Sequence, residues 1–313
     1  QHITLWMRDE EQARYIREHH ENQRYLPGIE LSQHIHPSTC LKESISQADV
    51  VFVALPSKVF RQVIHESAHL FPRDQIVIST TKGIEKKGFK LMSEVLEEEI
   101  PQTRVGVLSG PNLAAEMVRC ELTASVIASP HDEVRETVQA LLGCDYFRVY
   151  ANVDTYGVEL GGALKNIYAI ISGLAAARGM GENTKSMLIT RSLAEMSRFA
   201  VSLGANPMTF MGLAGVGDLI VTCTSDKSRN YRVGYALGQG ATLEDAVSRL
   251  GQVAEGAQTL LLVKEKAEEL GVPMPLVRGL YEILYNKASI TDVVNALMSA
   301  TQNSDVEFIL PRQ

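Results

Sequence analysis

The sequence predicts an α/β domain built on a parallel sheet, followed by a domain made only of helices. In the first half, short and continuously apolar runs alternate with amphipathic, charged segments. After about Asp154 this alternation stops and long helical patterns dominate. Strand–helix–strand repetition is typical of a doubly wound parallel sheet, because each parallel connection needs a crossover. The predicted domains are residues 1–153 and residues 154–313.

A series of apolar runs predicts the strands of the first domain. Their hydrophobicity is continuous rather than alternating, which suits a sheet buried on both faces. These runs are 3–8, 48–56, 75–80, 104–110, 123–129 and 147–152. Amphipathic segments predict helices at 9–22, 57–70 and 88–99. In the second domain, helical periodicity predicts helices over 154–178, 184–204, 242–248, 255–270, 275–286 and 291–299.

The composition argues against several classes of protein. The net charge of −7 and the pI of about 5.7 argue against a nucleic-acid partner, which needs a basic face. No stretch of about 18 or more apolar residues lacks a charge, so we expect no membrane-spanning segment. The four cysteines form no C-x-x-C pair, which indicates reduced, buried thiols rather than disulfides or a zinc site. No signal-peptide pattern opens the chain, so we expect a cytoplasmic protein.

The histidines also limit the chemistry. All eight lie at or before His131. His34 and His36 could chelate a metal, but no further ligand follows at a matching spacing, so no metal site is predicted. If the second domain carries the chemistry, its acid or base is therefore not an imidazole.

One signature of a dinucleotide-binding fold is missing from the sequence. Such a fold begins with a strand, a G-x-G-x-x-G turn and a helix, and no such turn follows residues 3–8. We interpret residues 3–8 as the second strand of a Rossmann-like fold whose first strand and phosphate loop are missing from this sequence. The alternative is that residues 3–8 are a genuine first strand. The segment MRDEEQA at its end would then bind phosphate poorly. If the sequence is complete, pyrophosphate binding should be weak, because the N–H donors of the loop are absent.

The carboxyl ends of the predicted strands indicate a binding crevice. In open parallel sheets, ligands bind beyond these ends. The segments found there are small, polar or cationic: Arg8-Asp9, 55–57, 81–83 and 109–112. If residues 3–8 are the second strand, Arg8 would accommodate the 2′-phosphate of NADP, while Asp9 leaves NAD possible. The alternative is that Arg8 is solvated at the start of a polar helix.

A single charge stands in the apolar segment LGGALKNIYAIISGLAAA, residues 160–177, and it is Lys165. Small residues lie one turn away on either side, so we expect this helix face to leave room for a ligand. Burial would lower the pKa of Lys165 towards neutrality, so that the amine could exchange protons with an alcohol or ketone. The alternative is a lysine that snorkels from a helix end into solvent.

Four sequence blocks together resemble the bacterial NAD(P)-dependent glycerol-3-phosphate dehydrogenases. They are VELGGALKNIYAIISG, SGPNLAAE (109–116), STTKGIE (79–85) and GLAGVGDLIVTCTSDKSRNYRVG (212–234). The resemblance runs from Ile3 to about Leu297 and departs from the family at the missing phosphate loop. It implies reversible reduction of dihydroxyacetone phosphate to sn-glycerol 3-phosphate, a precursor of phospholipids. It further implies NADP or NAD as the cofactor, a small phosphorylated substrate and a homodimer.

The resemblance also implies roles for individual residues. The catalytic residues would be Lys165, the proton donor and acceptor, with Lys82 and Asp218. The substrate would be bound by Lys82, Gly110, Asn112, Lys165, Asn166, Asp218, Thr222, Ser228, Arg229 and Asn230. With Arg8 added from its place after the strand, the cofactor residues would be Arg8, Lys82, Ala114, Arg229, Val253 and Glu255. Two alternatives stay open: Asp218 only orients Lys165, and Ser228 or Asn230 only caps a helix.

Two other functions remain compatible with the sequence. A related two-domain NAD(P)-dependent hydroxy-acid or phosphogluconate-type dehydrogenase would also have a catalytic lysine, but it would need a carboxylate-binding site. A catalytically dead cofactor-binding protein is the other alternative, and the missing phosphate loop is its main support.

Overall fold

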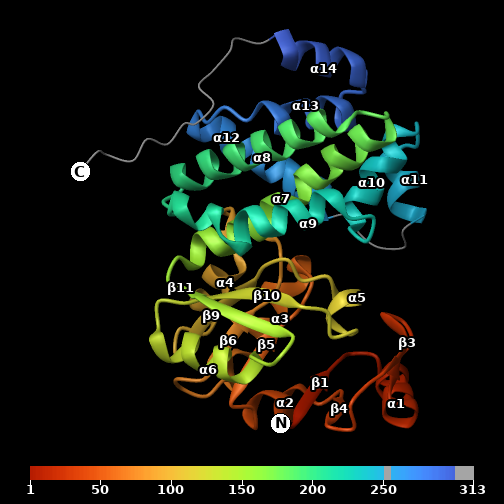
Figure 1. The fold of residues 1–313 in the computed structure, drawn as a ribbon. Coiled ribbons are helices and arrows are strands. Elements are labelled where there is room, and N and C mark those ends of the chain that lie inside the picture. The colour runs from red at the N-terminus through yellow and green to blue at the C-terminus, as the bar shows by residue number, and fades with distance from the viewer. Residues whose placement is uncertain (250–254, 300–313) are drawn as a thin grey trace.

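The computed structural model describes residues 1–249 and 255–299, and in it a helical domain lies on top of a sheet domain (Figure 1). The strands of the sheet domain are β1 (Ile3–Trp6), β2 (Glu21–Asn22), β3 (Leu26–Glu30), β4 (Ile35–Ser38), β5 (Val50–Val53), β6 (Ile76–Ser79), β7 (Ile84–Glu85), β8 (Lys90–Leu91), β9 (Arg104–Ser109), β10 (Thr123–Ala128) and β11 (Phe147–Asn152). Its helices are α1 (Glu10–His19), α2 (Leu41–Ser46), α3 (Ser57–Ser67), α4 (Met92–Glu99), α5 (Ala114–Met117) and α6 (Asp132–Leu142).

The central sheet has five strands in the order β11-β10-β9-β6-β5. The predicted parallel pairing is confirmed for β5–β6, β6–β9 and β10–β11. The exception is β9–β10, which is antiparallel, with Val126 opposite Ser109. A parallel connection needs a crossover of a dozen or more residues, usually a helix. The segment between β9 and β10 contains only the four-residue α5, so the chain reverses its direction there.

The first strand forms a sheet of its own with β4. The two strands are parallel, with Ile3 opposite Ile35. Within the described residues, β1 does not pair with β5, the edge of the central sheet. In a doubly wound sheet the first strand pairs across the switch point and the second strand lies one position further out. The observed pairing therefore agrees with the interpretation of residues 3–8 as a second strand.

Helices cover both faces of the central sheet. Phe60 and Ile64 of α3 pack with α4 and with Val77 of β6 in one apolar cluster. Val134 and Val138 of α6 pack against strands of the same sheet in another cluster. The sequence analysis did not predict α6, although its two valines have helical spacing. This two-sided cover explains why the strands are continuously apolar.

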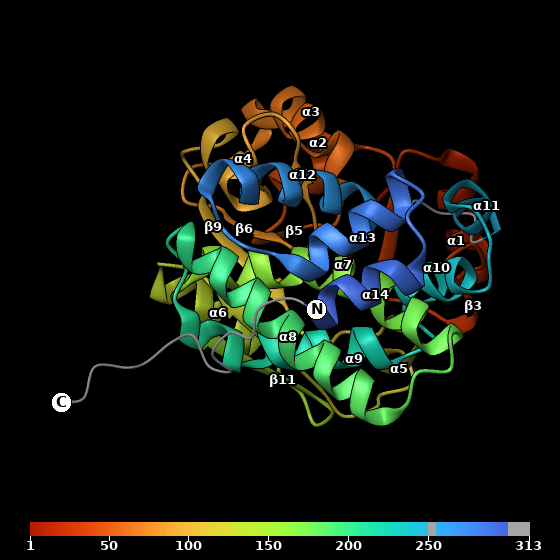
Figure 2. The same cartoon turned by 90° about the horizontal axis from the view of Figure 1, so that it is seen from above.

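The second domain is helical throughout its described part. Its elements are α7 (Thr155–Ala177), α8 (Glu182–Ser202), a 3₁₀ turn (Pro207–Met211), a π turn (Leu213–Gly217), α9 (Asp218–Thr224), α10 (Arg229–Gly238), α11 (Leu243–Arg249), α12 (Glu255–Leu270), α13 (Pro275–Tyr285) and α14 (Ile290–Ser299). Helix α7 lies near the centre of the view from above, and α8, α9, α10, α12 and α13 pack against it (Figure 2). This helix is long and apolar enough to cross a membrane, but 83% of its apolar window is buried inside the protein, as in a core helix.

The small residues of α7 bring other backbone segments close to it. A Cβ at Gly234 of α10 would overlap the Ile170 carbonyl, and a Cβ at Gly173 would overlap the Tyr231 carbonyl. A Cβ at Gly161 would come within 2.7 Å of the Ala214 carbonyl oxygen. The expectation that the helix face beside Lys165 leaves room for a ligand is therefore wrong at Gly161, because the Ala214 backbone fills the space.

The cysteines are only partly as predicted. All four are free thiols, as the absence of a C-x-x-C pair indicated. Only Cys223 is buried, however, while Cys40, Cys120 and Cys144 are exposed. The expectation of buried thiols is wrong for these three, because they lie in the surface segments that connect helices and strands.

Candidate active site

The candidate catalytic residues come from both domains. Lys165 lies in the middle of α7, and Asp218 is the first residue of α9, directly after the π turn. Such π turns occur frequently at functional sites. Lys82 lies in the segment after β6, at the carboxyl end of a central strand. The structure therefore brings all three residues to the junction between the sheet and the helical domain.

One carboxylate holds both lysine amines. Asp218 Oδ2 accepts a hydrogen bond of 2.9 Å from Lys82 Nζ, and Asp218 Oδ1 accepts another from Lys165 Nζ. Lys82 Nζ also donates to the Gly110 carbonyl at 3.2 Å. The exposed fraction of the side chain is 0% for Asp218 and 24% for Lys82. This arrangement places two cationic donors side by side in a site that is largely closed to water.

The electrostatics of the site act most strongly on Lys165. Burial lowers the pKa of Lys165 from its ordinary value of 10.5 to about 7, and the nearby charge of Lys82 lowers it further while Asp218 opposes the shift. The lowered pKa was predicted from the sequence and is confirmed. The alternative of a snorkelling lysine is wrong, because the side chain is 8% exposed and ends on a buried carboxylate. An amine with this pKa can both donate and accept a proton near neutral pH.

Two further predicted residues, Thr222 and Asn166, lie on the same helices as the lysine–aspartate pair. Thr222 lies one turn after Asp218 on α9, and its hydroxyl donates to the Asp218 carbonyl at 2.6 Å. Asn166 follows Lys165 on α7 and is buried. A Cβ at Gly256 would lie 2.5 Å from the Asn166 carbonyl oxygen, so α12 approaches α7 closely at this point.

The SGPNLAAE loop borders the site, because the Gly110 carbonyl accepts a hydrogen bond from Lys82 Nζ. Gly110 has a φ of 139°, which only glycine adopts readily, and a Cβ there would lie 3.2 Å from Ser125 Cα. Asn112 Oδ1 accepts a hydrogen bond of 2.7 Å from the Ser125 hydroxyl. The Asn112 amide nitrogen is therefore left to face other partners. Ala114 is exposed at the start of α5.

The serine, arginine and asparagine of the S-R-N block have different partners. Ser228 caps α10, because its hydroxyl accepts the Tyr231 N–H at 3.3 Å. Asn230 Oδ1 accepts the Gly256 N–H at 3.1 Å and so satisfies the beginning of α12. Arg229 is exposed at the first position of α10.

The predicted cofactor residues are only partly brought together. Burial raises the pKa of Glu255, and the charges of Arg229, Lys82 and Lys165 oppose that shift, so Glu255 lies near all three cations. Val253 lies outside the described residues. Arg8 is exposed at the end of β1, in a sheet separate from the one that carries Lys82. Its neighbour Asp9 is used as the N-cap of α1 and accepts the Gln12 N–H at 3.1 Å.

The sequence analysis missed one ion pair at this junction. Lys227 Nζ lies 2.6 Å from Glu116 Oε1, which joins the end of the SGPNLAAE loop to the S-R-N block. The sequence signal was available, because an acid and a lysine stand inside two blocks that were already expected to meet. Across residues 1–249 and 255–299, no group of three or more His, Cys, Asp or Glu side chains could hold a metal ion.

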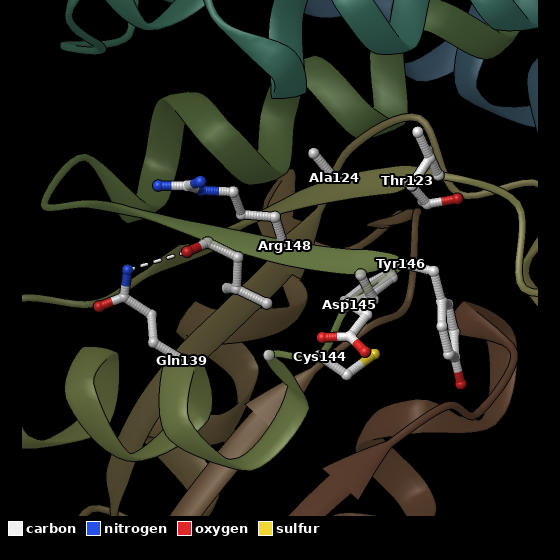
Figure 3. Close-up of a pocket in the computed structure, with 11 residues that line it drawn as sticks. Thr123, Ala124, Gln139, Cys144, Asp145, Tyr146 and Arg148 are labelled. Atoms are coloured by element: carbon white, nitrogen blue, oxygen red, sulfur yellow. Dashed lines mark hydrogen bonds between the residues drawn. The ribbon is translucent and has the colours of Figure 1, made fainter.

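Two cavities lie away from the lysine–aspartate pair itself. A cavity of about 540 Å³ opens beside Gly83 and Glu255, between the start of α3 and α12. A second, of about 550 Å³, is lined by residues of α6, β10 and β11, among them Gln139, Thr123 and Arg148 (Figure 3). Neither is lined by Lys165 or Asp218. The first adjoins the candidate site, because Gly83 follows Lys82 directly.

Comparison with known proteins agrees with this geometry. Residues 1–135 match the model of the NAD-dependent glycerol-3-phosphate dehydrogenase N-terminus, and residues 154–295 match that of its C-terminus. A glycerol-3-phosphate dehydrogenase [NAD(P)+] of Pseudomonas fluorescens is 60% identical over 98% of this chain and 90% of the relative. The crystal structure of a glycerol-3-phosphate dehydrogenase from Coxiella burnetii has a TM-score of 0.91 at 34% identity and covers 96% of this chain and 92% of that one.

A more distant structure bears on the alternative of a hydroxy-acid dehydrogenase. A D-mandelate dehydrogenase in complex with NADH has a TM-score of 0.52 at 13% identity, with 91% of this chain and 90% of that one covered. This likeness shows a shared fold alone. The junction of Lys82, Lys165 and Asp218 agrees with these matches. The high identity and the two matched domain models show that the chain belongs to the NAD-dependent glycerol-3-phosphate dehydrogenase family.

Proposed function

We propose that Lys165 is the proton donor in the NAD(P)-dependent reduction of dihydroxyacetone phosphate to sn-glycerol 3-phosphate. The reaction is reversible, and its product supplies phospholipid synthesis. The observation that carries the assignment is a buried amine, with a pKa of about 7, held by a fully buried carboxylate beside a second lysine. This combination suits proton transfer to a carbonyl oxygen at neutral pH.

When bound, a nicotinamide cofactor would supply the hydride to the substrate carbon in one direction and accept it in the other. As negative charge grows on the carbonyl oxygen, Lys165 Nζ donates a proton to it. The Lys82 ammonium stabilises the same charge, and both donors are already oriented by Asp218 before the reaction begins. In the direction of oxidation, neutral Lys165 accepts the proton of the alcohol.

The phosphate of the substrate would be bound at the start of α10. Arg229 stands at the first position of this helix, whose free N–H groups favour an anion. Asn230 uses its oxygen for the Gly256 N–H, so its amide nitrogen is left to donate to the phosphate. We assign Gly110, Asn112, Asn166, Thr222 and Ser228 to the remaining contacts of the substrate.

The described residues fit the nicotinamide end of the cofactor. The buried hydroxyl of Ser109 has no hydrogen-bond partner among the described residues, and a Cβ at Gly162 would lie 2.7 Å from it, next to the Lys82 stem. The cavity beside Gly83 and Glu255 adjoins the same place. We assign the contacts with the cofactor to Lys82, Ala114, Arg229, Glu255 and Val253, with Arg8 at the 2′-phosphate of NADP.

The proposal also covers the domain boundaries, the oligomeric state and the cellular location of the protein. We infer domains of residues 1–153 and 154–313, a homodimer and a cytoplasmic location. Exposed apolar side chains on the helical domain, such as Met208, Met211 and Ile220, support self-association. Light scattering after size exclusion should give twice the chain mass of 34.4 kDa, and a mass equal to one chain would refute the dimer.

Steady-state kinetics test the reaction. Dihydroxyacetone phosphate should be reduced with NADH or NADPH much faster than a 2-keto acid of similar size. Lys165→Met should lower kcat by about 10²- to 10⁴-fold, which is the usual contribution of a general acid. Lys185→Met is the matched control, because Lys185 pairs with Glu182 on the surface of α8. Faster turnover of the 2-keto acid would favour the hydroxy-acid enzyme, and no turnover of either would favour the catalytically dead protein.

A further inference from the structure

We propose that Glu159 is a positioning residue for the proton transfer, because it fixes the segment that carries Lys82 against the helix that carries Lys165. This inference rests on the function proposed above. Glu159 stands on α7 only six positions before Lys165 and was not singled out by the sequence analysis. Its carboxylate binds Met92 and Ser93 rather than either lysine, so its role is indirect.

Glu159 joins the two domains through the first residues of α4. Its side chain is almost completely buried, and Oε1 accepts the Met92 N–H at 2.9 Å and the Ser93 N–H at 3.2 Å. Oε2 accepts the Ser93 hydroxyl. The first N–H groups of a helix have no partner within the helix. A carboxylate of the helical domain therefore satisfies the beginning of a helix in the sheet domain.

The chain between Lys82 and this contact lies against α7. It consists of the hairpin β7–β8, which ends at Leu91, directly before α4. Ile84 and Leu91 are buried in the same apolar cluster as Leu160 and Leu164 of α7. The hairpin is thus packed on α7 by its apolar side chains and fixed at its far end by Glu159. Lys82 precedes this fixed segment by two residues.

Glutamine would satisfy these donors less well than the carboxylate does. Burial raises the pKa of Glu159 to about 7, while the hydrogen bonds from Ser93 and Met92 oppose that shift. Glutamine has nearly the same shape, but only one of its two terminal atoms accepts hydrogen bonds. In Glu159→Gln the amide nitrogen cannot accept the Ser93 N–H, which Oε2 accepts at 3.2 Å, or the Ser93 hydroxyl proton. The substitution therefore loosens the contact without opening a cavity.

The pKa of Lys165 reports whether the two lysines remain together. The charge of Lys82 lowers the pKa of Lys165. If the segment after β6 moves away from α7, this like-charge effect weakens and the pKa of Lys165 rises. A change in global stability alone would not produce this shift, because it leaves the folded site as it was.

Glu195 provides a matched control. Its side chain is also buried, its carboxylate accepts the N–H groups of Leu276 and Val277 at the start of α13, and burial raises its pKa to about 7. Both α8, which carries Glu195, and α13 belong to the helical domain. Glu195 also accepts a hydrogen bond of 3.3 Å from the Tyr168 hydroxyl of α7. All these contacts lie within the helical domain, so Glu195→Gln removes a helix-capping contact and leaves the contacts between the domains in place.

The experiment compares Glu159→Gln, Glu195→Gln and the unsubstituted chain. NMR titration of lysine-labelled protein, without cofactor or substrate, gives the pKa of Lys165, with Lys165→Met used to assign its signal. In Glu159→Gln we expect this pKa to rise by about half a unit or more. We expect kcat to fall about 10- to 100-fold, as for a misplaced catalytic group. Glu195→Gln should leave the pKa of Lys165 unchanged and kcat within about twofold.

Several results would overturn the proposal. One is a kcat and a Lys165 pKa in Glu159→Gln that equal those of the unsubstituted chain. Another is an equal loss in both variants, which would indicate a general structural role.

If Glu159→Gln does not fold, Ser93→Ala and its control Ser192→Ala replace the pair, since both hydroxyls are buried. Only Ser93→Ala should then raise the pKa of Lys165, and equal values would refute the idea. Failure of the proposed function is separate: the unsubstituted chain would then not reduce dihydroxyacetone phosphate at all.

Discussion

Lys82 and Asp218 are 136 positions apart in the sequence, yet Lys82 Nζ and Asp218 Oδ2 are separated by only 2.9 Å. The contact joins the end of a sheet strand to the start of a helix in the other domain. Because Asp218 also binds Lys165, a single carboxylate determines where both ammonium groups stand.

Asp218→Asn should therefore damage both lysines. The isosteric amide removes the negative charge that opposes the lowering of the Lys165 pKa, so this pKa should fall below about 7. We expect kcat for dihydroxyacetone phosphate to drop by about 10²-fold or more. Steady-state kinetics and a thermal melt would measure activity and folding together. Asp226→Asn, at an exposed aspartate beyond α9, should behave as the unsubstituted chain does.

The two directions of the reaction should depend on pH with opposite signs. Reduction needs protonated Lys165, so its kcat/KM should fall as the pH rises through about 7, the pKa of this amine. Oxidation of sn-glycerol 3-phosphate needs the neutral amine, so its kcat/KM should rise over the same interval. Parallel profiles in both directions, measured in buffers of constant ionic strength, would contradict the role of Lys165.

Gly234→Ala should destabilise the helical domain. The added Cβ would overlap the Ile170 carbonyl and push α10 away from α7. Overpacking of this kind costs about 1–3 kcal/mol of unfolding free energy. Urea denaturation would measure the loss. Gly181→Ala is the control, since nothing lies within 4 Å of a Cβ at that position, and an equal loss there would refute the packing argument.

Arg8→Asp tests the cofactor preference. If Arg8 faces the 2′-phosphate, the aspartate should repel it and lower kcat/KM for NADPH about tenfold or more relative to NADH. Arg14→Asp is the control, because Arg14 is also exposed and lies on the adjacent α1. An unchanged ratio between the two coenzymes in Arg8→Asp would remove this residue from the site.

Local sequence patterns predicted most elements of the sheet domain and the longest helices. The strand predicted over 147–152 has those bounds in β11, and the segment 154–178 contains α7. Continuous apolar runs and helical spacing are properties of consecutive residues, so they can be recognised without knowing the fold. Short elements such as β7, β8 and α5 were not predicted, because they consist of two to four residues and carry no periodicity.

The sequence by itself determined that Lys165 is the single charge of an apolar helix, and it left open whether the amine is buried or reaches solvent. Only the tertiary structure decided what that amine contacts. The Asp218 carboxylate, the charge of Lys82 and the Glu159 contact with α4 all come from residues remote in the chain. It also decided that Gly161 and Gly173 of α7 face protein backbone, while Gly162 faces the side chains of Ser109 and Lys82. The physical reason is that partners distant in sequence meet only when the two domains pack, and no local pattern encodes that packing.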